Sequence, residues 1–284
     1  MTVEASHLAA DAGHHNGTDS GPLQAAQGFR IPFQSLRVIA ALFIREMNTA
    51  YGRSSLGYLW SFIEPIGGIV ILAISFSLIF RTPPLGDSFL LFYATGYLPF
   101  SMYVALHSRL AAALRQNKAL MFYPAVTFVD VFIARTLLIV VSEVTVIFLV
   151  FASIMLASDT GAQVDFTWQL IALLMVLGIG VGVGMVNAVL FNIYPSWASI
   201  WQILNRPIFF LSGVFFVFDA LPPEAQAILK WNPVAHVIAA VRIGIYPEYE
   251  SEFLSVGYVA LVSLVLWVVG FGLLRKHYRS IINN

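Results

Sequence analysis

Three charged residues lie inside one long apolar stretch of this sequence. Asp130, Arg135 and Glu143 interrupt the segment 127–156, which is otherwise hydrophobic. Charges in such a segment are costly and are usually paired or face an aqueous path. Arg135 and Glu143 are eight residues apart, which puts them roughly on one face of a helix. We therefore expect a structural ion pair between these two side chains, with a proton relay as the alternative.

A second set of residues is aromatic. Tyr93, Tyr97, Phe100 and Tyr103 recur at three- and four-residue spacing and would form one continuous helix face. Sugar rings can stack on aromatic faces while a Tyr hydroxyl forms hydrogen bonds. We interpret this stripe as the candidate lining of a carbohydrate path, with helix packing or an interface belt as the alternative. The candidate lining is extended by Phe209, Phe210, Phe215 and Phe216.

The residues of common catalytic and metal sites are missing. The chain has no Cys, no H-E-x-x-H pattern and no Ser/His/Asp arrangement. It contains no Gly-Lys pair, so it cannot hold the phosphate-binding loop G-x-x-x-x-G-K-[ST]. We therefore predict no catalytic residues, no metal site, no bound cofactor and no ATP hydrolysis by this chain alone.

The composition requires a membrane environment for these residues. Of the 284 residues, 59% are hydrophobic and only 11% are charged, whereas soluble domains carry about 25% charged residues. A net charge of zero gives no indication of a nucleic-acid partner. The sequence therefore predicts an all-α integral membrane protein.

Six membrane-spanning helices are predicted from the apolar stretches. Their approximate bounds are 61–80, 89–106, 127–156, 168–191, 200–218 and 256–274. Between the last two, Pro222-Pro223 and Asn232-Pro233 divide an apolar segment into two helices too short to span, which we expect to be re-entrant. Gly178, Gly180, Gly182 and Gly184 form two small-x-x-x-small patterns in the fourth span, which favour close helix packing over a hinge.

The region before the first span divides into a tail and an amphipathic helix. Residues 1–28 are polar and small, and we predict a disordered cytoplasmic tail ahead of the transmembrane domain 29–284. In the segment 31–50, Phe33, Leu36, Ala40, Phe43 and Met47 oppose Gln34, Arg37, Arg45 and Thr49. This pattern predicts a helix lying in the membrane interface.

The distribution of Lys and Arg predicts the orientation. With both termini in the cytoplasm, the outer segments hold only Arg81, Lys230 and Arg242. The cytoplasmic segments then hold Arg30, Arg37, Arg45, Arg53, Arg109, Arg115, Lys118, Arg206, Arg275, Lys276 and Arg279. Positive residues prefer the cytoplasmic side, so this asymmetry favours an even number of spans with both ends inside.

Several of these features together resemble the permease subunits of type-2 ABC exporters, most closely the bacterial polysaccharide branch. The residues that carry the resemblance are Arg45-Glu46, Tyr51-x-x-Ser54-x-Leu56-Gly57-Tyr58-Leu59-Trp60, Glu64-Pro65, the run Asn117 to Pro124, Leu221-Pro222, Asn232-Pro233 and Arg242. The resemblance extends from Pro32 to the C-terminus. Within the branch, the short loops look like the capsular polysaccharide inner-membrane permeases.

This resemblance implies a function and a set of partners. Such permeases form homodimers in the bacterial inner membrane and recruit two cytoplasmic ABC ATPases, which bind ATP and Mg. The substrate would be a lipid-linked polysaccharide moving through a channel between the two copies, with periplasmic or outer-membrane export partners beyond it. The ATPase-coupling residues would be Arg109, Arg115, Asn117, Lys118 and Tyr123.

The implied substrate needs a cationic receiver at the inner leaflet. Arg45 and Arg53 flank the turn before the first span, and Arg can hold a phosphate bidentately. We predict that they receive the lipid phosphate, the alternative being nonspecific attraction to anionic lipids. For the whole chain, the alternatives are export of O-antigen, a teichoic-acid-like polymer, a lipid or a drug, or a membrane enzyme acting on lipid-linked sugars.

Overall fold

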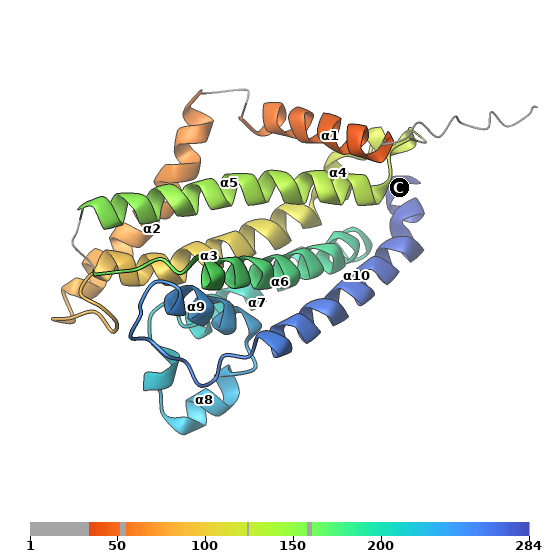
Figure 1. Cartoon of the computed structure of the whole chain (residues 1–284). Helices are drawn as coiled ribbons and strands as arrows, with labels where there is room; N and C mark the ends of the chain where they lie inside the picture. Colours follow the sequence, from red (N-terminus) through yellow and green to blue (C-terminus); the bar gives the residue numbers. More distant parts are fainter. Residues whose placement is uncertain (1–33, 52–54, 124, 158–160, 284) are drawn as a thin grey trace, which may run out of the picture. The chain divides into compact units, whose positions relative to one another are not determined.

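The computed structural model describes residues 34–51, 55–123, 125–157 and 161–283, and every regular element within them is helical (Figure 1). Ser35–Asn284 form one compact unit. The predicted tail 1–28, the beginning of the predicted interfacial helix at 31–33 and Arg53 lie outside the described residues.

In the part of the chain that the structure describes, four helices are long and apolar enough to cross a membrane: α3 (Phe89–Ala111), α5 (Phe128–Ala157), α6 (Phe166–Ile193) and α10 (Val256–Asn283). They correspond to four of the six expected spans. Local signals fix the beginnings of two of them: Ser88 accepts a hydrogen bond from the Leu91 amide at the start of α3. Asp165 does the same for the Thr167 amide at the start of α6.

Helices also lie at the other two expected spans. They are α2 (Ser55–Ser77), whose apolar part is Phe62–Ser77, and α7 (Trp197–Leu211). The 15 residues of α7 extend over about 22 Å, against about 30 Å for the hydrocarbon core of a bilayer. The predicted end at 218 was wrong, because Ser212 ends the helix and Gly213, with φ of 82°, then turns the chain.

The two short helices predicted before the last span are confirmed as helices. They are α8 (Pro223–Leu229) and α9 (Pro233–Ile243). Each begins with a Pro, which has no amide hydrogen to lose at the first helical position. Asn232 caps α9 by accepting a hydrogen bond from the Val234 amide. The prolines that divide this segment in the sequence therefore set both helix starts.

Glycines let α6 approach two neighbours closely, which confirms the packing prediction. A Cβ atom at Gly184 would lie 2.7 Å from Cβ of Leu110 in α3. A Cβ atom at Gly182 would lie 2.7 Å from Cβ of Leu266 in α10. One glycine pair thus faces α3 and the other faces α10, so α6 lies between these two helices.

Helix α1 (Gln34–Tyr51) lies against α4 (Ala113–Gln116) and the beginning of α5 (Figure 1). Its buried face holds Leu42, which packs with Ala113, Val131 and Ala134, and Glu46. The predicted apolar stripe is not this face: Leu36 is exposed and Phe43 and Met47 are only half-buried. The helix therefore docks through a mixed face and leaves much of its apolar stripe uncovered by the chain.

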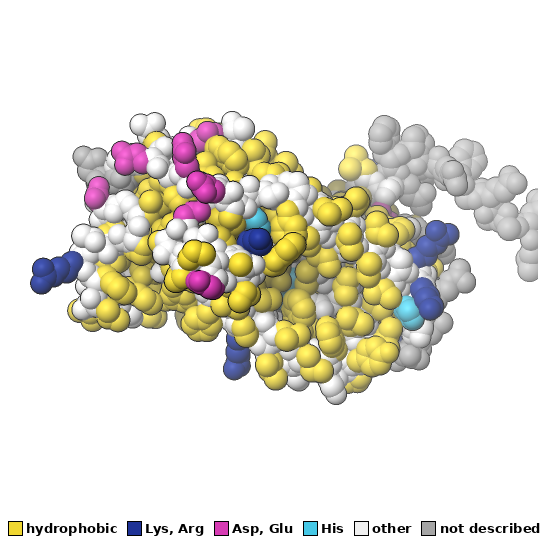
Figure 2. Space-filling model, turned by 90° about the horizontal axis from the view of Figure 1, so that it is seen from below, with side chains coloured by type: hydrophobic (Ala, Val, Ile, Leu, Met, Phe, Trp, Pro, Cys, Tyr) yellow, Lys and Arg dark blue, Asp and Glu magenta, His cyan; other side chains and the backbone are white. Residues whose placement is uncertain are grey.

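Figure 2 shows a surface that is largely hydrophobic, as expected for a chain that crosses a membrane, with Asp and Glu gathered toward one end. Exposed acidic residues are found in α8, in the short helix Phe218–Ala220 before it and in the loop after α9. They include Asp219, Glu224, Glu248, Glu250 and Glu252. Acidic side chains thus predominate in segments that we predicted to lie on the outer side because they hold few Lys and Arg.

Candidate substrate-entrance and coupling site

The predicted ion pair between Arg135 and Glu143 was wrong. Arg135 pairs with Glu46 of α1, with Nη1 and Oε2 3.1 Å apart. Glu143 pairs instead with Arg109 of α3, with Nη2 and Oε1 3.4 Å apart. Helical spacing placed the two charges on one side of α5, but it could not show that each has a nearer partner on another helix.

Asp130 has a local role at the beginning of α5. The Thr127 amide and hydroxyl both donate to Oδ2 of Asp130, at 3.0 and 2.8 Å, and the Asp130 amide donates to the Thr127 hydroxyl at 3.2 Å. This reciprocal arrangement is a capping box. The Ser35 hydroxyl of α1 donates to the other carboxylate oxygen, so the cap also ties α1 to α5. Its hydrogen bonds account for the burial of this carboxylate.

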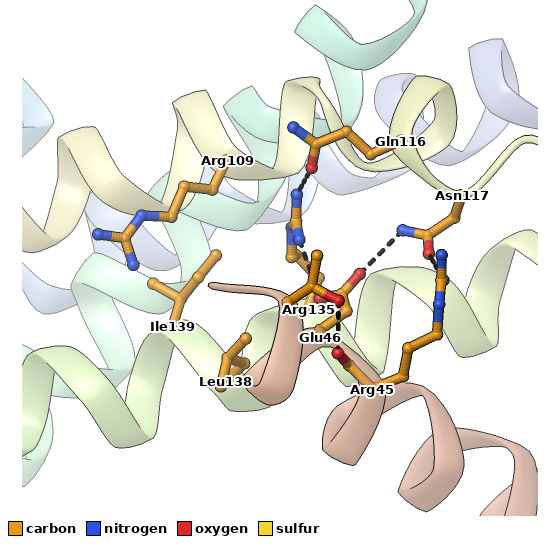
Figure 3. Close-up of a pocket in the computed structure, with 9 residues that line it drawn as sticks. Arg45, Glu46, Arg109, Gln116, Asn117, Arg135, Leu138 and Ile139 are labelled. Carbon is orange, nitrogen blue, oxygen red and sulfur yellow. Dashed lines mark hydrogen bonds and ion pairs between the residues drawn. The ribbon is translucent and has the colours of Figure 1, made fainter. Parts of the chain in front are cut away.

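Asn117 joins α1 to the segment that follows α3. Its carbonyl oxygen accepts a hydrogen bond from Arg45 Nη1 at 2.9 Å, and its amide donates to Glu46 Oε1 at 2.8 Å (Figure 3). The amide also donates to the Ala113 carbonyl at 3.1 Å. Because Asn117 is almost fully buried, these contacts fix the position of the segment relative to α1.

The same network includes two side chains that we did not single out as site residues from the sequence. Glu46 bridges Asn117 and Arg135, and Gln116 accepts a hydrogen bond from Arg135 Nη2. The only sequence signal for Glu46 is its position beside Arg45 in the motif that carries the family resemblance. Glu46 places a negative charge among Arg45, Arg109 and Arg135, and these groups surround a cavity of about 550 Å³ (Figure 3).

The predicted coupling residues fall into two groups. Arg115, Lys118 and Tyr123 are exposed or half-exposed around α4 and the following turn. Phe122, next to Tyr123, is also exposed, at 62%. Arg109 instead turns toward Glu143, and Asn117 is buried. The structure thus offers an outward-facing segment whose inner side is hydrogen-bonded to α1.

The aromatic stripe of α3 is mostly internal. Tyr93 and Tyr103 lie in the hydrophobic core, at 1% and 3% exposure. Tyr97 and Phe100 line a second cavity of about 470 Å³, together with Phe209 of α7. The Phe209 ring lies 4.9 Å from that of Phe100 and 6.3 Å from that of Tyr97, measured between centroids. Within one copy of the chain, only part of the stripe therefore borders open space.

The remaining predicted lining residues lie at the end of α7. Phe210 is exposed at 59% and stacks on Phe215, with ring centroids 5.4 Å apart. Phe215 and Phe216 follow the end of α7 and are half-buried. The four phenylalanines therefore do not share one helix face, because the chain turns at Gly213.

Comparisons with known proteins identify relatives of this chain. The family model described as ABC-2 type transporter matches residues 37–246. The polysialic acid transport protein KpsM of Escherichia coli is 31% identical over 252 residues, covering 87% of this chain and 95% of its own length. The capsule polysaccharide export inner-membrane proteins CtrC of Neisseria meningitidis and BexB of Haemophilus influenzae are 26% and 25% identical. Each match covers 86% of this chain and 92% of the relative. The chain therefore belongs to the ABC-2 type transporter family.

Proposed function

We propose that this chain is the transmembrane subunit of an ATP-driven exporter that moves lipid-linked capsular polysaccharide across the bacterial inner membrane. The relatives named above are capsule and polysialic acid transport proteins, and the similarity covers nearly the whole of their length. The sequence has no phosphate-binding loop, so a separate ATPase must supply the hydrolysis. In this proposal the chain binds no cofactor, and ATP and Mg bind to the ATPase.

The proposed assembly follows from the family. Two copies of the chain form the channel, two ATPases bind on the cytoplasmic side, and further export partners act in the periplasm and outer membrane. Each copy crosses the membrane six times with both termini inside, with α2 and α7 as two of the crossings and α8 and α9 re-entrant. Helix α1 lies in the inner interface, with its uncovered apolar residues toward the lipid.

One observation carries the coupling part of this proposal. The exposed segment around α4 is hydrogen-bonded from behind to α1 through Asn117, and α1 is bonded in turn to α5 through Glu46 and Arg135. A movement of the bound ATPase would therefore reach α5 through directional contacts as well as through the chain itself. Arg45 belongs to the same network and borders the first cavity, where it can meet a lipid phosphate.

The channel part of the proposal concerns the second cavity. Tyr97, Phe100 and Phe209 give it aromatic faces, and Ser101 and Glu64 give it groups that hydrogen-bond sugar hydroxyls. We assign the substrate path to this cavity and assign Tyr93 and Tyr103 to packing of the core.

The coupling segment is tested by co-purification with a cytoplasmic ABC ATPase from the same organism. Replacing Phe122 and Tyr123 together by Ala should reduce the amount of ATPase retained and the hydrolysis it performs, because both side chains are exposed at more than 60% on the proposed contact surface. Trp231→Ala is a matched control, since Trp231 is equally exposed but lies between α8 and α9. Normal retention of the ATPase by the double variant would show that the coupling surface lies elsewhere.

A further inference from the structure

The two cavities of the site are adjacent, and one side chain belongs to both. The first is bordered by Arg45, Glu46, Asn117 and Arg135, and the second by Glu64, Tyr97, Phe100 and Glu143. Among the described residues, Arg109 is the one that lines both cavities. Along α5, the lining residues continue from Arg135 and Ile139 in the first cavity to Glu143 in the second. The cavities therefore follow one groove between α3 and α5, with Arg109 at the junction.

The charge changes sign along this groove. Arg45, Arg109 and Arg135 outnumber Glu46 around the first cavity, whereas Glu64 and Glu143 outnumber Arg109 around the second. An anion is therefore attracted into the first cavity and repelled by the second. We therefore expect an anion to stop at the junction of the two cavities, beside Arg109, which is the last cation of the groove.

Arg109 is held in a way that leaves it available to another anion. Its side chain is 44% exposed, whereas that of Glu143 is 10% exposed. The ion pair joins its Nη2 to Oε1 of Glu143, at 3.4 Å. A guanidinium has five donors and can hold a phosphate with two of them. Arg135, by contrast, already contacts both Glu46 and Gln116.

We propose that the junction of the two cavities is a binding site for a phosphate group, with Arg109 as its ligand and Glu143 as the resident carboxylate that the phosphate displaces. Glu143 keeps a hydrogen bond with Ser101 when Arg109 leaves it. A phosphate held there directs any attached sugar into the second cavity, beside Tyr97, Phe100 and Phe209. The identity of the attached group rests on the proposed export function, but binding of the phosphate does not.

The test measures phosphate binding to the purified full-length chain in zwitterionic detergent, without an ATPase and without transport. The probes are dioctyl phosphate, which imitates a lipid phosphate, and inorganic phosphate. Binding to the folded state raises the unfolding temperature by an amount that grows with the logarithm of one plus the ratio of probe concentration to Kd, so the concentration dependence gives a Kd for each probe. Failure of this test is separate from failure of the ATPase co-purification, so the two proposals can fail independently.

Three variants identify the site. Glu143→Gln removes the competing carboxylate with little change of shape, so the Kd should fall about fivefold or more, as expected for coupled sites. Arg109→Gln should abolish saturable binding. The exchange Arg109→Glu with Glu143→Arg restores an ion pair but moves the cation to α5, so it should fold normally and bind weakly.

Glu64→Gln is the matched control. It removes the same charge from the second cavity but leaves the pair of Arg109 and Glu143 intact, so its effect should be smaller than that of Glu143→Gln. Equal changes of Kd in the two variants would mean that only the net charge around the cavity affects binding. Phosphate would then not displace Glu143 from Arg109, and the proposal would be wrong. Unchanged affinity in Arg109→Gln, or no binding of either probe to the unmodified chain, would also overturn the proposal. With the expected pattern, binding of both probes assigns the site to the phosphate group itself, and binding of dioctyl phosphate alone assigns it to a lipid phosphate.

Discussion

Two arginines are held in this chain by different means: Arg242 is buried, whereas the side chain of Arg135 is 14% exposed. Arg135 in α5 is neutralised by Glu46 and lies beside the first cavity. Arg242 in α9 is 2% exposed and forms no ion pair with any residue that the structure describes. It donates to the carbonyls of Phe216 and Val214, at 2.8 and 3.4 Å, and its guanidinium lies 4.3 Å from the centroid of the Phe92 ring.

The difference indicates which charges can change partners. The carbonyls and the aromatic ring around Arg242 belong to fixed backbone and core positions, so this cation holds the turn after α7 against α3 and α9. Burial lowers the pKa of the Arg242 guanidinium to about 10, so it stays charged at neutral pH. Arg135, Glu46, Arg109 and Glu143 are all side chains beside water-accessible cavities, where one partner can replace another. We therefore expect conformational change on the α1 side and rigidity around α9.

The largest expected effect is a difference in labelling between the two sides of the membrane. We expect Arg242 near the outer side and Arg135 near the cytoplasmic side. Because the chain has no Cys, single Cys substitutions can be labelled against a silent background. An impermeant thiol reagent added to intact cells should label Cys at Asp87 and Glu250, near the Arg242 region. It should not label Cys at Lys118 or His277. Labelling of position 118 from outside would reverse the orientation.

Position 159, which we also expect on the outer side, lies outside the described residues. Labelling of a Cys there would extend the topology test to the connection between α5 and α6. Permeabilised cells give the control, since all five positions should then react.

The second prediction breaks the paired arginine. Glu46→Ala leaves Arg135 without its carboxylate and should weaken docking of α1 by about 3 kcal/mol, the lower end for a broken buried pair because a cavity lies beside it. Labelling of a Cys at the buried position Leu42 should then be about a hundredfold faster.

Removal of both charges sharpens this result. Glu46→Leu with Arg135→Met leaves no unpaired charge, and most of the docking should return. If the double variant labels as fast as Glu46→Ala, the network depends on Asn117 and Arg45 more than on the ion pair.

The third prediction concerns the arginine without a carboxylate. Arg242→Met and Arg242→Lys should each lower the free energy of unfolding by about 2 kcal/mol, because neither side chain can bond both carbonyls and cover the Phe92 ring. Thermal unfolding of the purified chain measures the change. Full stability of the Lys variant would show that a positive charge at position 242 is enough to stabilise the fold. The carbonyl and ring contacts would then not distinguish Arg242 from Arg135.

The smallest expected effect concerns the capping box of α5. Asp130→Ala should cost about 1 kcal/mol, the usual value of a helix cap, and should also loosen the beginning of α1 through Ser35. Thr127→Ser keeps the hydroxyl and should be nearly neutral. A loss similar to that of Glu46→Ala would mean that Asp130 belongs to the charge network, contrary to the local role assigned here.

Local sequence signals predicted much of the helical architecture. Pro222-Pro223 and Asn232-Pro233 set the starts of α8 and α9, and the glycine pairs of α6 gave the close packing against α3 and α10. Such signals act over a few residues of chain, so they are visible in one sequence. The end of α7 was missed because Gly213 lies within an apolar run that gave no other sign of a turn.

The candidate site was less predictable. Arg45, Asn117 and Arg135 were each singled out from the sequence, but as members of three separate sets. Glu46 connects them only because α1 lies against α4 and α5. In the sequence, 71 positions separate Glu46 from Asn117. The stripe of Tyr93, Tyr97, Phe100 and Tyr103 does form a helix face, but its exposure depends on which neighbours cover it.

The sequence by itself determined that this is a helical membrane protein without a nucleotide-binding loop, since composition, apolar length and missing motifs are properties of the chain alone. The tertiary structure decided which charges pair and which aromatic residues border a cavity. Pairing energy depends on distances of a few ångströms between helices far apart in sequence, and helical spacing carries no information about those distances. Arg135 therefore finds Glu46 and leaves Glu143 to Arg109, where the two cavities meet.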